Sequence, residues 1–265
     1  MATLSGKGAI VYGAGGRDNM GQAIARRLIA EGAEVMVTGR KEDVLEEFVA
    51  AHGGAWHLVD ITNKTQVFDA AREARKRFGN LSIGVNATGW GLLKPFEENT
   101  EDDLDKMFAT QFKGPFFFLQ AMIEGMTEGG SIVQISSATA TIQLEQHAAY
   151  MGTKAGIDHV VRTVANEFGH RGIRANSVSP GLTETPMAGD AFSIPAFIEA
   201  FRKEYPLGRV GTVEDIAAAV AWLANDECFM TGQNLQVNGG LTLRRNPSLA
   251  ELAELAEKAT QHLRE

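Results

Sequence analysis

The sequence is poor in cysteine, because Cys228 is the single one among 265 residues. One cysteine excludes any intramolecular disulfide, which fits a reducing compartment. Residues 1–7 also lack the basic stretch followed by an apolar stretch that a secretory signal peptide needs. We therefore expect a cytoplasmic protein.

Basic charge and long apolar runs are scarce as well. The chain has 25 Lys and Arg against 33 Asp and Glu, and its densest basic run, Arg72 to Arg77, is typical of a solvated helix side. Binding of duplex nucleic acid needs a clustered basic face, so we expect no nucleic-acid partner. The most apolar run, Pro115 to Met122, is far shorter than the ~20 residues of a membrane helix, so no membrane partner is expected. The histidines show no ligand spacing with carboxylates or thiols, which predicts no metal site.

The chain does contain a regular alternation of short apolar runs with longer helical patterns. Continuous apolar strands separated by helices are typical of a parallel sheet covered on both faces. The sequence therefore predicts an α/β protein with a Rossmann-type, doubly wound parallel sheet of about seven strands and helices on both faces. The expected strands are Ala9–Tyr12, Val35–Thr38, Trp56–Val59, Ile83–Val85, Ile132–Ile135, Arg174–Val178 and Leu235–Val237. Long helices are expected over 103–126 and 147–168.

Neither a repeat nor a Pro/Ser-rich linker divides the chain, so we expect one domain over residues 1–245. Within it, residues 188–206 break the alternation and look like a helical insertion over the end of the sheet. Residues 246–265 look like a C-terminal helical extension that opens on a capping-box pattern, Ser248 to Glu251. The apolar side of this extension needs a surface, either on its own domain or on a neighbouring subunit.

A glycine-rich segment follows the first expected strand and leads directly into a helix: Gly13-Ala-Gly15-Gly16-Arg17-Asp18-Asn19-Met20-Gly21. Glycines in this place let the backbone approach a pyrophosphate, and a helix N-terminus offers free N–H groups and partial positive charge. Asn19 is suited to cap the helix, with Gln22 as its reciprocal partner. The position between strand and helix favours a dinucleotide site, and the alternative is a tight turn without a ligand.

The end of the second expected strand bears on the choice of dinucleotide. An NAD site needs an acidic residue there, whereas an NADP site places an arginine near the 2′-phosphate. The strand ends without a carboxylate, and Arg40 follows at once. A guanidinium pairs bidentately with a phosphate, and Arg17 in the glycine-rich segment adds a second positive charge. We expect NADP(H) rather than NAD(H), the alternative being that Arg40 is an exposed arginine at the start of a helix.

Tyr150 and Lys154 lie at positions i and i+4 of an expected helix, and therefore on one face of it. A free phenol has a pKa of about 10, and a neighbouring ammonium lowers that pKa. Such a tyrosine donates a proton to a carbonyl oxygen as hydride reaches the carbon, or takes it back in reverse. Ser137 follows an expected strand and is suited to bind the same oxygen. This spacing alone is common by chance, and the glycine-rich segment and Ser137 are what favour the functional interpretation.

With these features the sequence resembles the short-chain dehydrogenases/reductases, over about residues 6–242. Further segments carry the resemblance: Asp60, Val85-Asn86-Ala87-Thr88-Gly89, Ile135-Ser136-Ser137, Gly172-Ile-Arg-Ala-Asn176, Ser179-Pro180-Gly181-Leu-Thr183-Glu-Thr185-Pro186, Gly232 and Val237-Asn238-Gly239-Gly240.

The resemblance implies an NAD(P)-dependent enzyme that interconverts ketones and secondary alcohols, commonly as a homodimer or homotetramer. Tyr150 would be the catalytic acid–base, Ser137 would orient the substrate, and Lys154 would hold the nicotinamide ribose and lower the pKa of the tyrosine. Asp60 with Ile61 would meet the adenine, Asn86 would lie beside its ribose, and Thr183 and Thr185 would contact the carboxamide or pyrophosphate. The expected cofactor-binding residues are Gly13, Gly15, Gly16, Arg17, Asn19, Met20, Arg40, Asp60, Ile61, Asn86, Ala87, Thr88, Gly89, Tyr150, Lys154, Pro180, Gly181, Thr183 and Thr185.

Three departures from the family pattern stand out. The glycine-rich segment is longer than usual, since Gly21 lies eight positions after Gly13, and it is similar to that of the enoyl reductase branch. Thr88 stands in a motif that usually reads Asn-Asn-Ala-Gly. Gln111 aligns with the family's fourth catalytic residue, an asparagine that helps to hold a water leading to the lysine. The longer glutamine side chain would hold that water poorly, unless the backbone carbonyl does the holding.

The substrate should lie beyond the carboxyl ends of the strands, beneath the insertion at 188–206. The expected substrate-binding residues are Ser137, Trp90, Thr139, Leu144, His147, Met187 and Phe192, with Leu92 and Ile142 as further candidates. This set is largely apolar and favours a hydrophobic or cyclic ketone. Two alternatives stay open: an enoyl reductase, against which the Tyr–Lys spacing counts, and a cofactor-binding sensor or scaffold without chemistry, which only Gln111 favours.

Overall fold

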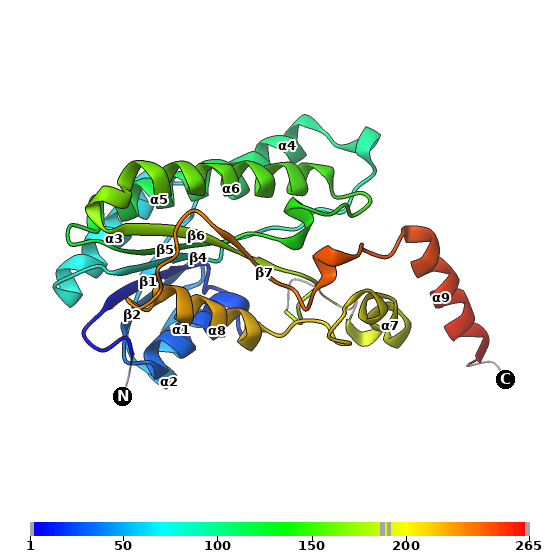
Figure 1. Cartoon of the computed structure of the whole chain (residues 1–265), viewed down its shortest axis with the longest axis horizontal. Helices are drawn as coiled ribbons and strands as arrows, with labels where there is room; N and C mark the ends of the chain where they lie inside the picture. The colour runs from blue at the N-terminus through cyan, green and yellow to red at the C-terminus, as the bar shows by residue number, and fades with distance from the viewer. Residues whose placement is uncertain (1–2, 186–188, 190–191, 263–265) are drawn as a thin grey trace.

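Seven strands form one parallel sheet in the computed structural model, which describes residues 3–185, 189 and 192–262 (Figure 1). The strands are β1 (Gly8–Tyr12), β2 (Glu34–Gly39), β3 (Ala55–Leu58), β4 (Ile83–Asn86), β5 (Gly130–Ile135), β6 (Ile173–Pro180) and β7 (Asn234–Val237). Their order across the sheet is β3-β2-β1-β4-β5-β6-β7, and each neighbouring pair is parallel. The predicted doubly wound α/β fold is therefore confirmed.

Helices cover both faces of the sheet (Figure 1). The described helices are α1 (Met20–Ala30), α2 (Glu42–His52), α3 (Lys64–Phe78), α4 (Glu101–Phe108), α5 (Gly114–Gly125), α6 (Ala148–Phe168), α7 (Pro195–Glu204), α8 (Val213–Ala224) and α9 (Leu249–His262). One apolar core joins the sheet to α1, α2 and α8, and a second joins it to α3, α5 and α6. Alternate residues of β1 enter alternate cores, Val11 the first and Ile10 the second, as the two-residue period of a strand requires. No described helix combines the length and the apolar character that crossing a bilayer would take.

The long helix expected over 103–126 is interrupted, and that prediction was wrong in this respect. A π-helical turn over Ala109–Lys113 separates α4 from α5. Pro115 explains the break, because it has no N–H to donate to the carbonyl of Gln111 in an α-helical ladder. Such turns are frequent at functional sites, and Gln111 lies inside this one.

The sheet order places a crevice next to the glycine-rich segment. β1 lies between β2 and β4: the chain runs from β1 outward to β2 and β3, and then crosses to β4 on the other side of β1. Ligands of such sheets bind outside the carboxyl ends of the strands at this reversal. Gly13 ends β1 with φ +99°, and a Cβ there would stand 2.6 Å from the carbonyl carbon of Ala87 after β4. Only glycine fits this close approach.

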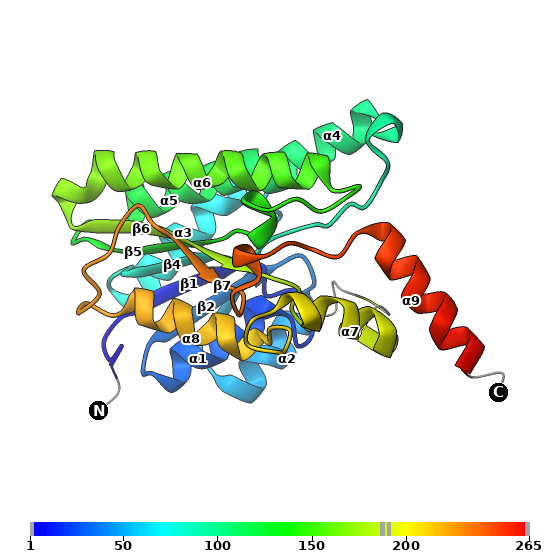
Figure 2. The same cartoon turned by 45° about the vertical axis from the view of Figure 1, so that its right-hand side comes forward.

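Two helices lie beyond the carboxyl ends of the strands. α7 and α9 run beside each other at one end of the molecule, seen in yellow and red in Figures 1 and 2. α9 begins one residue after Ser248, whose hydroxyl accepts from Glu251 N while the Glu251 carboxylate accepts from Ser248 N. The predicted C-terminal helix is thus present over residues 249–262.

Candidate active site

The glycine-rich segment is held in shape by Asn19 and Gln22. Asn19 Oδ1 accepts from Gln22 N at 2.9 Å, which caps α1, while Asn19 Nδ2 donates to the Gly13 carbonyl at 2.8 Å. Gln22 does not return a bond to Asn19 as expected. Its Oε1 accepts from Asp18 N instead, since Asp18 takes a left-handed backbone (φ 52°) that turns its N–H toward the helix. The segment is therefore pre-formed at the N-terminus of α1, where backbone N–H groups favour an anion.

The two arginines expected near the cofactor differ in their surroundings. Arg17 Nη2 lies 2.8 Å from Glu47 and 3.4 Å from Asp43, both on α2, so its charge is engaged by carboxylates. Arg40 is exposed directly after β2, and in the described part of the chain it forms no ion pair. Of the two, Arg40 is the free guanidinium at the strand end.

Asp60 and Asn86 are both occupied by local hydrogen bonds. Asp60 Oδ1 accepts from Thr62 N and Oγ1 at 2.9 and 2.7 Å. Partial burial works to raise the pKa of Asp60, but these bonds and the charge of Arg40 outweigh it and leave that pKa below its ordinary value. Asn86 donates to Gln134 Oε1 and accepts from Thr88, so its side chain fixes the turn after β4. Any contact that Asn86 makes with a ligand would therefore come from its backbone.

Ser137, Tyr150 and Lys154 line one cavity together with residues at the glycine-rich segment, and we call this part of the cavity its inner end. The cavity has a volume of about 400 Å³, and it begins beside the glycine-rich segment. Tyr150 lies in the first turn of α6 and Lys154 in the next, as the i, i+4 spacing predicts. Predicted residues that line the cavity are Asn19, Met20, Ala87, Thr88, Gly89, Ser137, Thr139, Leu144, His147, Tyr150, Lys154, Pro180, Gly181, Thr183 and Thr185.

The hydroxyl of Ser137 is oriented by the short turn that follows β5. Thr139 N donates to Ser137 Oγ at 3.2 Å, and the two hydroxyls lie 2.8 Å apart. Ser137 Oγ accepts from this backbone N–H, and either hydroxyl can donate to the other, so the hydrogen of Ser137 is available to a ligand when Thr139 is the donor of the pair.

The pKa of Tyr150 corrects one expectation. Burial raises it to about 12, outweighing the lowering effect of the hydrogen bond with Ser137, and the charge of Asp158 adds to the rise. Lys154 Nζ lies 5.5 Å from the centre of the tyrosine ring and donates to the Ile135 carbonyl at 2.8 Å. The predicted net lowering of the Tyr150 pKa is therefore wrong for this arrangement, because burial dominates, and Tyr150 is a neutral phenol at neutral pH.

Lys154 is buried, and its pKa is also shifted. Removal from water lowers the pKa of Lys154 to about 8, against the opposing effect of the Asp158 charge. Asp158 was missed in the sequence, although it follows Lys154 by one helical turn. Its Oδ2 accepts from Ser136 Oγ at 2.7 Å and from Asn234 Nδ2 at 2.6 Å. Burial raises the pKa of this carboxyl, and the hydrogen bond from Ser136 and the charges of Lys154 and Arg162 counteract part of the rise.

Gln111 faces the segment after β4 rather than the cavity itself. Its Nε2 donates to the Trp90 carbonyl at 3.1 Å, and its Oε1 is buried without a hydrogen-bond partner among the described residues. A buried acceptor of this kind is costly unless a donor reaches it. Gln111 lies within the π-helical turn, so the direction of its side chain is set by a turn that an uninterrupted α-helix would lack.

The substrate-binding residues divide into two groups. Ser137, Thr139, Leu144 and His147 line the cavity, as predicted. The ring of Trp90 instead lies 3.9 Å from Lys106 Nζ, and neither Trp90 nor Phe192 is among the described residues of the cavity wall. Met187 lies outside the described residues.

Several residues of the cavity wall were not predicted. They come from the segment before α6, from α7, and from the turn that leads into α9: Leu93, Glu145, Gln146, Phe197, Phe201, Leu241, Asn246, Leu249 and Leu252. The aromatic spacing on α7 and the leucine spacing on α9 were visible in the sequence, but neither indicates which surface a helix covers.

The residues present fit a nicotinamide dinucleotide. The glycine-rich segment suits a pyrophosphate, since Asn19, Met20 and Gly21 line the crevice at the N-terminus of α1, where a helix offers free backbone N–H groups. The segment 180–185 and residues 87–89 line the same crevice from β6 and β4. Arg40 follows the end of β2 and forms no ion pair among the described residues.

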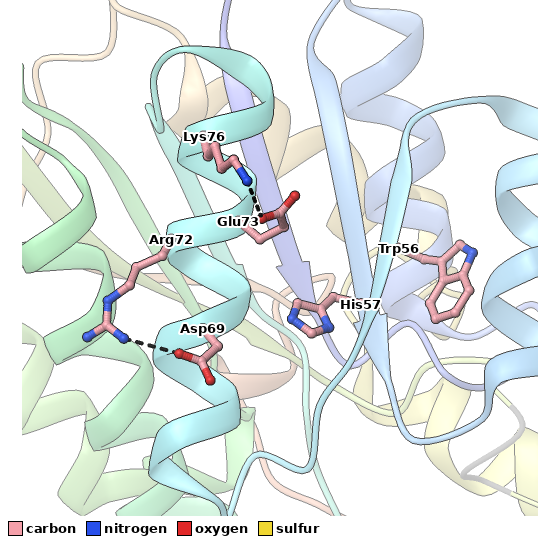
Figure 3. A pocket seen from close by; sticks show the side chains of 6 residues that line it. All are labelled: Trp56, His57, Asp69, Arg72, Glu73 and Lys76. Atoms are coloured by element: carbon pink, nitrogen blue, oxygen red, sulfur yellow. Dashed lines mark hydrogen bonds and ion pairs between the residues drawn. The ribbon is translucent and has the colours of Figure 1, made fainter.

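A second, shallower hollow lies at the edge of the sheet formed by β3, with a volume of about 510 Å³ (Figure 3). Its wall is formed by Trp56 and His57 of β3 and by four charged residues of α3. Those charges pair with each other, Arg72 with Asp69 at 3.1 Å and Lys76 with Glu73 at 3.9 Å. None of the predicted site residues lines this hollow.

Comparisons with known proteins agree with this geometry. A family model described as "Enoyl-(Acyl carrier protein) reductase" matches residues 13–242. D-threitol dehydrogenase of Mycolicibacterium smegmatis is 34% identical over 249 residues, which are 91% of this chain and 95% of that protein. 3beta-hydroxysteroid dehydrogenase 1 of Eggerthella lenta is 34% identical over 247 residues, 89% of this chain and 95% of that protein.

A solved structure of a short-chain type dehydrogenase/reductase from Mycobacterium ulcerans superposes with a TM-score of 0.89. It is 30% identical, with 95% of each chain covered. The sequence matches and the structural superposition both cover nearly the whole chain. The chain therefore belongs to the short-chain dehydrogenase/reductase family of oxidoreductases.

Proposed function

We propose that this protein is an NADP(H)-dependent oxidoreductase that interconverts a ketone and a secondary alcohol on a hydrophobic or cyclic substrate. The supporting observation is that Ser137, Tyr150 and Lys154 lie at one end of an otherwise largely apolar cavity that begins at the glycine-rich segment. A bound nicotinamide would supply or accept the hydride.

The chain's own residues account for the proton. Tyr150, kept neutral by burial, donates its phenolic hydrogen to the carbonyl oxygen of the ketone. Ser137 donates to the same oxygen when Thr139 is the donor of the hydroxyl pair. Lys154 is anchored on the Ile135 carbonyl and provides a positive charge beside the phenol, which stabilises the phenolate left after proton transfer. In the alcohol-oxidising direction the same phenolate accepts the proton.

The preference for NADP(H) rests on Arg40. A 2′-phosphate needs a bidentate cation, and a 2′-hydroxyl needs a carboxylate at the end of β2. β2 ends on Gly39, Arg40 follows it, and its guanidinium is exposed and unpaired within the described residues. Asp60 lies near enough to feel the charge of Arg40, but its carboxylate is engaged by Thr62. Arg17 is paired with two carboxylates, so it contributes less to the binding of a 2′-phosphate.

The substrate class rests on the cavity wall. Related proteins carry names that refer to polar substrates, such as D-threitol and glucose, and to apolar rings, such as hydroxysteroid and hydroxynaphthalene. Beyond the catalytic end, the wall here includes Leu93, Leu144, Phe197 and Phe201. Such a wall gains from burying an apolar ring and leaves sugar hydroxyls without partners, so a ring ketone is the better fit.

Purified protein tests the proposal by oxidation of NADPH and NADH over cyclic ketones, a sugar ketone and enoyl thioesters. We expect NADPH oxidation with cyclic ketones, and a preference for NADPH over NADH. Turnover of enoyl thioesters without any ketone would contradict the proposal in favour of an enoyl reductase. That alternative is supported by the long glycine-rich segment, and the spacing of four between Tyr150 and Lys154 counts against it.

Cofactor binding without turnover of either class would instead favour the sensor or scaffold alternative, for which the unpartnered Gln111 Oε1 is the supporting feature. The cytoplasmic location and a homodimeric or homotetrameric state also stay predictions. Size-exclusion chromatography with light scattering measures the second directly.

A further inference from the structure

We propose that Asp158 is a positioning residue of the active site: its carboxylate is the buried counter-charge that keeps Lys154 in place as an ammonium. This inference rests on the proposed function, because Asp158 would act only through Lys154. The side chain of Asp158 is not part of the cavity wall, so it would touch neither the cofactor nor the substrate.

Lys154 and Asp158 form a pair of buried charges without a parallel in the described part of the chain. Lys154 is 2% exposed, and no other Lys or Arg there is buried. Asp158 is 5% exposed, and no other Asp or Glu there is buried. The two lie at positions i and i+4 of α6, and therefore on one face of it. Since a buried charge is costly without an opposite charge nearby, each of the two stabilises the other.

Both side chains are fixed to consecutive residues at the end of β5. Lys154 Nζ donates to the Ile135 carbonyl at 2.8 Å, and Asp158 Oδ2 accepts from Ser136 Oγ at 2.7 Å. Ser137, which comes next, lines the cavity. Because Lys154 donates to the carbonyl and not to the carboxylate, the two charges act on each other through space. The position of the ammonium is thus set by one hydrogen bond and one charge.

The hydrogen bonds to Asp158 leave part of its charge uncompensated. Oδ2 accepts from Asn234 Nδ2 of β7 at 2.6 Å as well as from Ser136. Oδ1 is buried and has no hydrogen-bond partner among the described residues. By the alternation of β6, Ser177 and Ser179 face α6, and both side chains are neutral. The strands below α6 therefore present dipoles to Asp158 and no cation.

Few other charges act on this pair. The charge of Asp158 raises the pKa of Lys154 against the larger effect of burial, which leaves it at about 8. Asp158 also raises the pKa of Tyr150. Arg162 acts on Asp158 from one turn further along α6, but it is exposed and therefore screened by solvent. Removal of the carboxylate should thus lower the pKa of Lys154 and leave less ammonium between pH 7 and 8.

Charged side chains on the other elements that contact α6 lie away from the pair. Those of α5, of the π-helical turn and of the turn at residues 169–171 are exposed. Those of α4 are exposed as well, apart from Asp103, which pairs with Lys94. Arg174 of β6 donates to the carbonyls of Leu223 and Asn225 at the end of α8. Asp158 is therefore the carboxylate that a test of the Lys154 charge has to change.

Asp158→Asn keeps the shape of the side chain and removes its charge. We measure kcat/KM for cyclohexanone and the bicyclic 2-tetralone with NADPH from pH 6 to pH 9. The alkaline fall should move down by about one pH unit, which makes kcat/KM about fivefold lower than in the unaltered protein at pH 8 and within about twofold at pH 6. Arg162→Gln is the matched control on the same helix, and it should move the fall by less than about 0.2 pH unit.

A merely structural role of Asp158 gives a different result. It would lower kcat/KM by the same factor at every pH. That outcome, an unshifted profile in Asp158→Asn, or an equal shift in Arg162→Gln would overturn the inference. If Asp158→Asn does not fold, Asp158→Leu carries the same test, because an apolar side chain with the same branching removes the charge without leaving a buried polar group.

The proposed function and this inference fail in different ways. If no ketone is turned over, the proposed function fails, and Asp158 is then judged by the titration of Lys154 itself. The ¹³Cε NMR signal of Lys154 in protein with labelled lysine, assigned by its loss in Lys154→Met, reports the ammonium directly. A midpoint about one pH unit lower in Asp158→Asn but not in Arg162→Gln would support the inference. The same midpoint in the unaltered protein and in both variants would contradict it.

Discussion

The two ends of the cavity are built in different ways. The inner end consists of residues that directly follow strands or begin helices: the glycine-rich segment after β1, Ser137 after β5, and Tyr150 in the first turn of α6. The outer end gathers side chains from segments far apart in the chain, from Leu93 to Leu252. Hydrogen bonds to backbone dominate at the inner end, and apolar side-chain contacts dominate at the outer end.

The difference suggests a division of work. The inner end fixes donors against the place where charge develops, which any substrate of the reaction needs. We expect the outer end to contact the part of the substrate that lies away from the reacting carbon, and so to discriminate among substrates by size. Changes at the inner end should therefore affect all ketones equally, and changes at the outer end should affect them according to size.

The largest effect is expected from Tyr150→Phe. Removal of the acid should lower kcat about 10³-fold for cyclohexanone and 2-tetralone alike. NADPH binding, measured by fluorescence, should stay within about twofold, because the ring and its stacking on His147 are kept. Tyr205→Phe is the matched control, since that hydroxyl donates to Leu182 outside the catalytic end. A loss confined to one of the two ketones would break the division between the ends.

Arg40→Ala should weaken the binding of NADPH to the same extent whichever ketone is reduced. Loss of a charge-assisted pair, about 1.5–3 kcal/mol, should raise the KM for NADPH roughly ten- to hundredfold. The KM for NADH should change little. Arg17→Ala is the control, because Arg17 is already paired with Glu47, and its effect should be several times smaller. Equal rises for both cofactors in Arg40→Ala would contradict NADP(H) preference.

The pH dependence of reduction tests the buried lysine. Burial lowers the pKa of Lys154 to about 8, so its charge is lost as the pH rises through 8 rather than through its ordinary ~10.4. Tyr150, with its raised pKa, stays protonated over this range. We expect kcat/KM for both cyclic ketones to be constant below pH 7 and about tenfold lower near pH 9. A profile that stays flat to pH 10 would show that this charge is not needed.

The smallest effects concern two helix caps, one on α8 in the main core and one on α9 at the outer end of the cavity. Thr212→Ala removes the cap of α8, which packs in the main core, and should lower the free energy of unfolding by about 1 kcal/mol. Ser248→Ala removes the cap of α9, where Leu249 is 41% exposed, so global unfolding should change less. Hydrogen exchange should instead speed up within α9 alone. The reverse pattern would mean that α9 belongs to the main cooperative unit.

The fold and the inner end could be predicted from the sequence because both follow from local patterns. Apolar runs, helical spacing and the segment after β1 are read within about ten residues, and the parallel sheet brings the ends of separate strands together. The cap by Asn19 and the meeting of Tyr150 with Lys154 are examples.

Other features depend on contacts that no local pattern contains. The π-helical turn at Gln111 depends on how the backbone rearranges before Pro115. The helical spacing of residues 103–126 gives no indication of this rearrangement. The lowering of the Tyr150 pKa was wrongly predicted because spacing indicates neighbours but not burial. Trp90 was assigned to the cavity because it follows β4 closely, whereas its ring contacts the ammonium group of Lys106. The outer end of the cavity was missed because α7 and α9 reach it only through tertiary packing.

The two serines at the end of β5 show how much depends on alternation along a strand. Ser136 donates into the protein to Asp158, and Ser137 turns the other way, toward Thr139 and the cavity. A one-residue slip in the pairing of β5 with β6 would exchange them, leaving Asp158 without its donor and the reacting oxygen without its partner. A single inserted residue in β5 would thus lower stability and turnover together, which makes this strand a poor place for insertions.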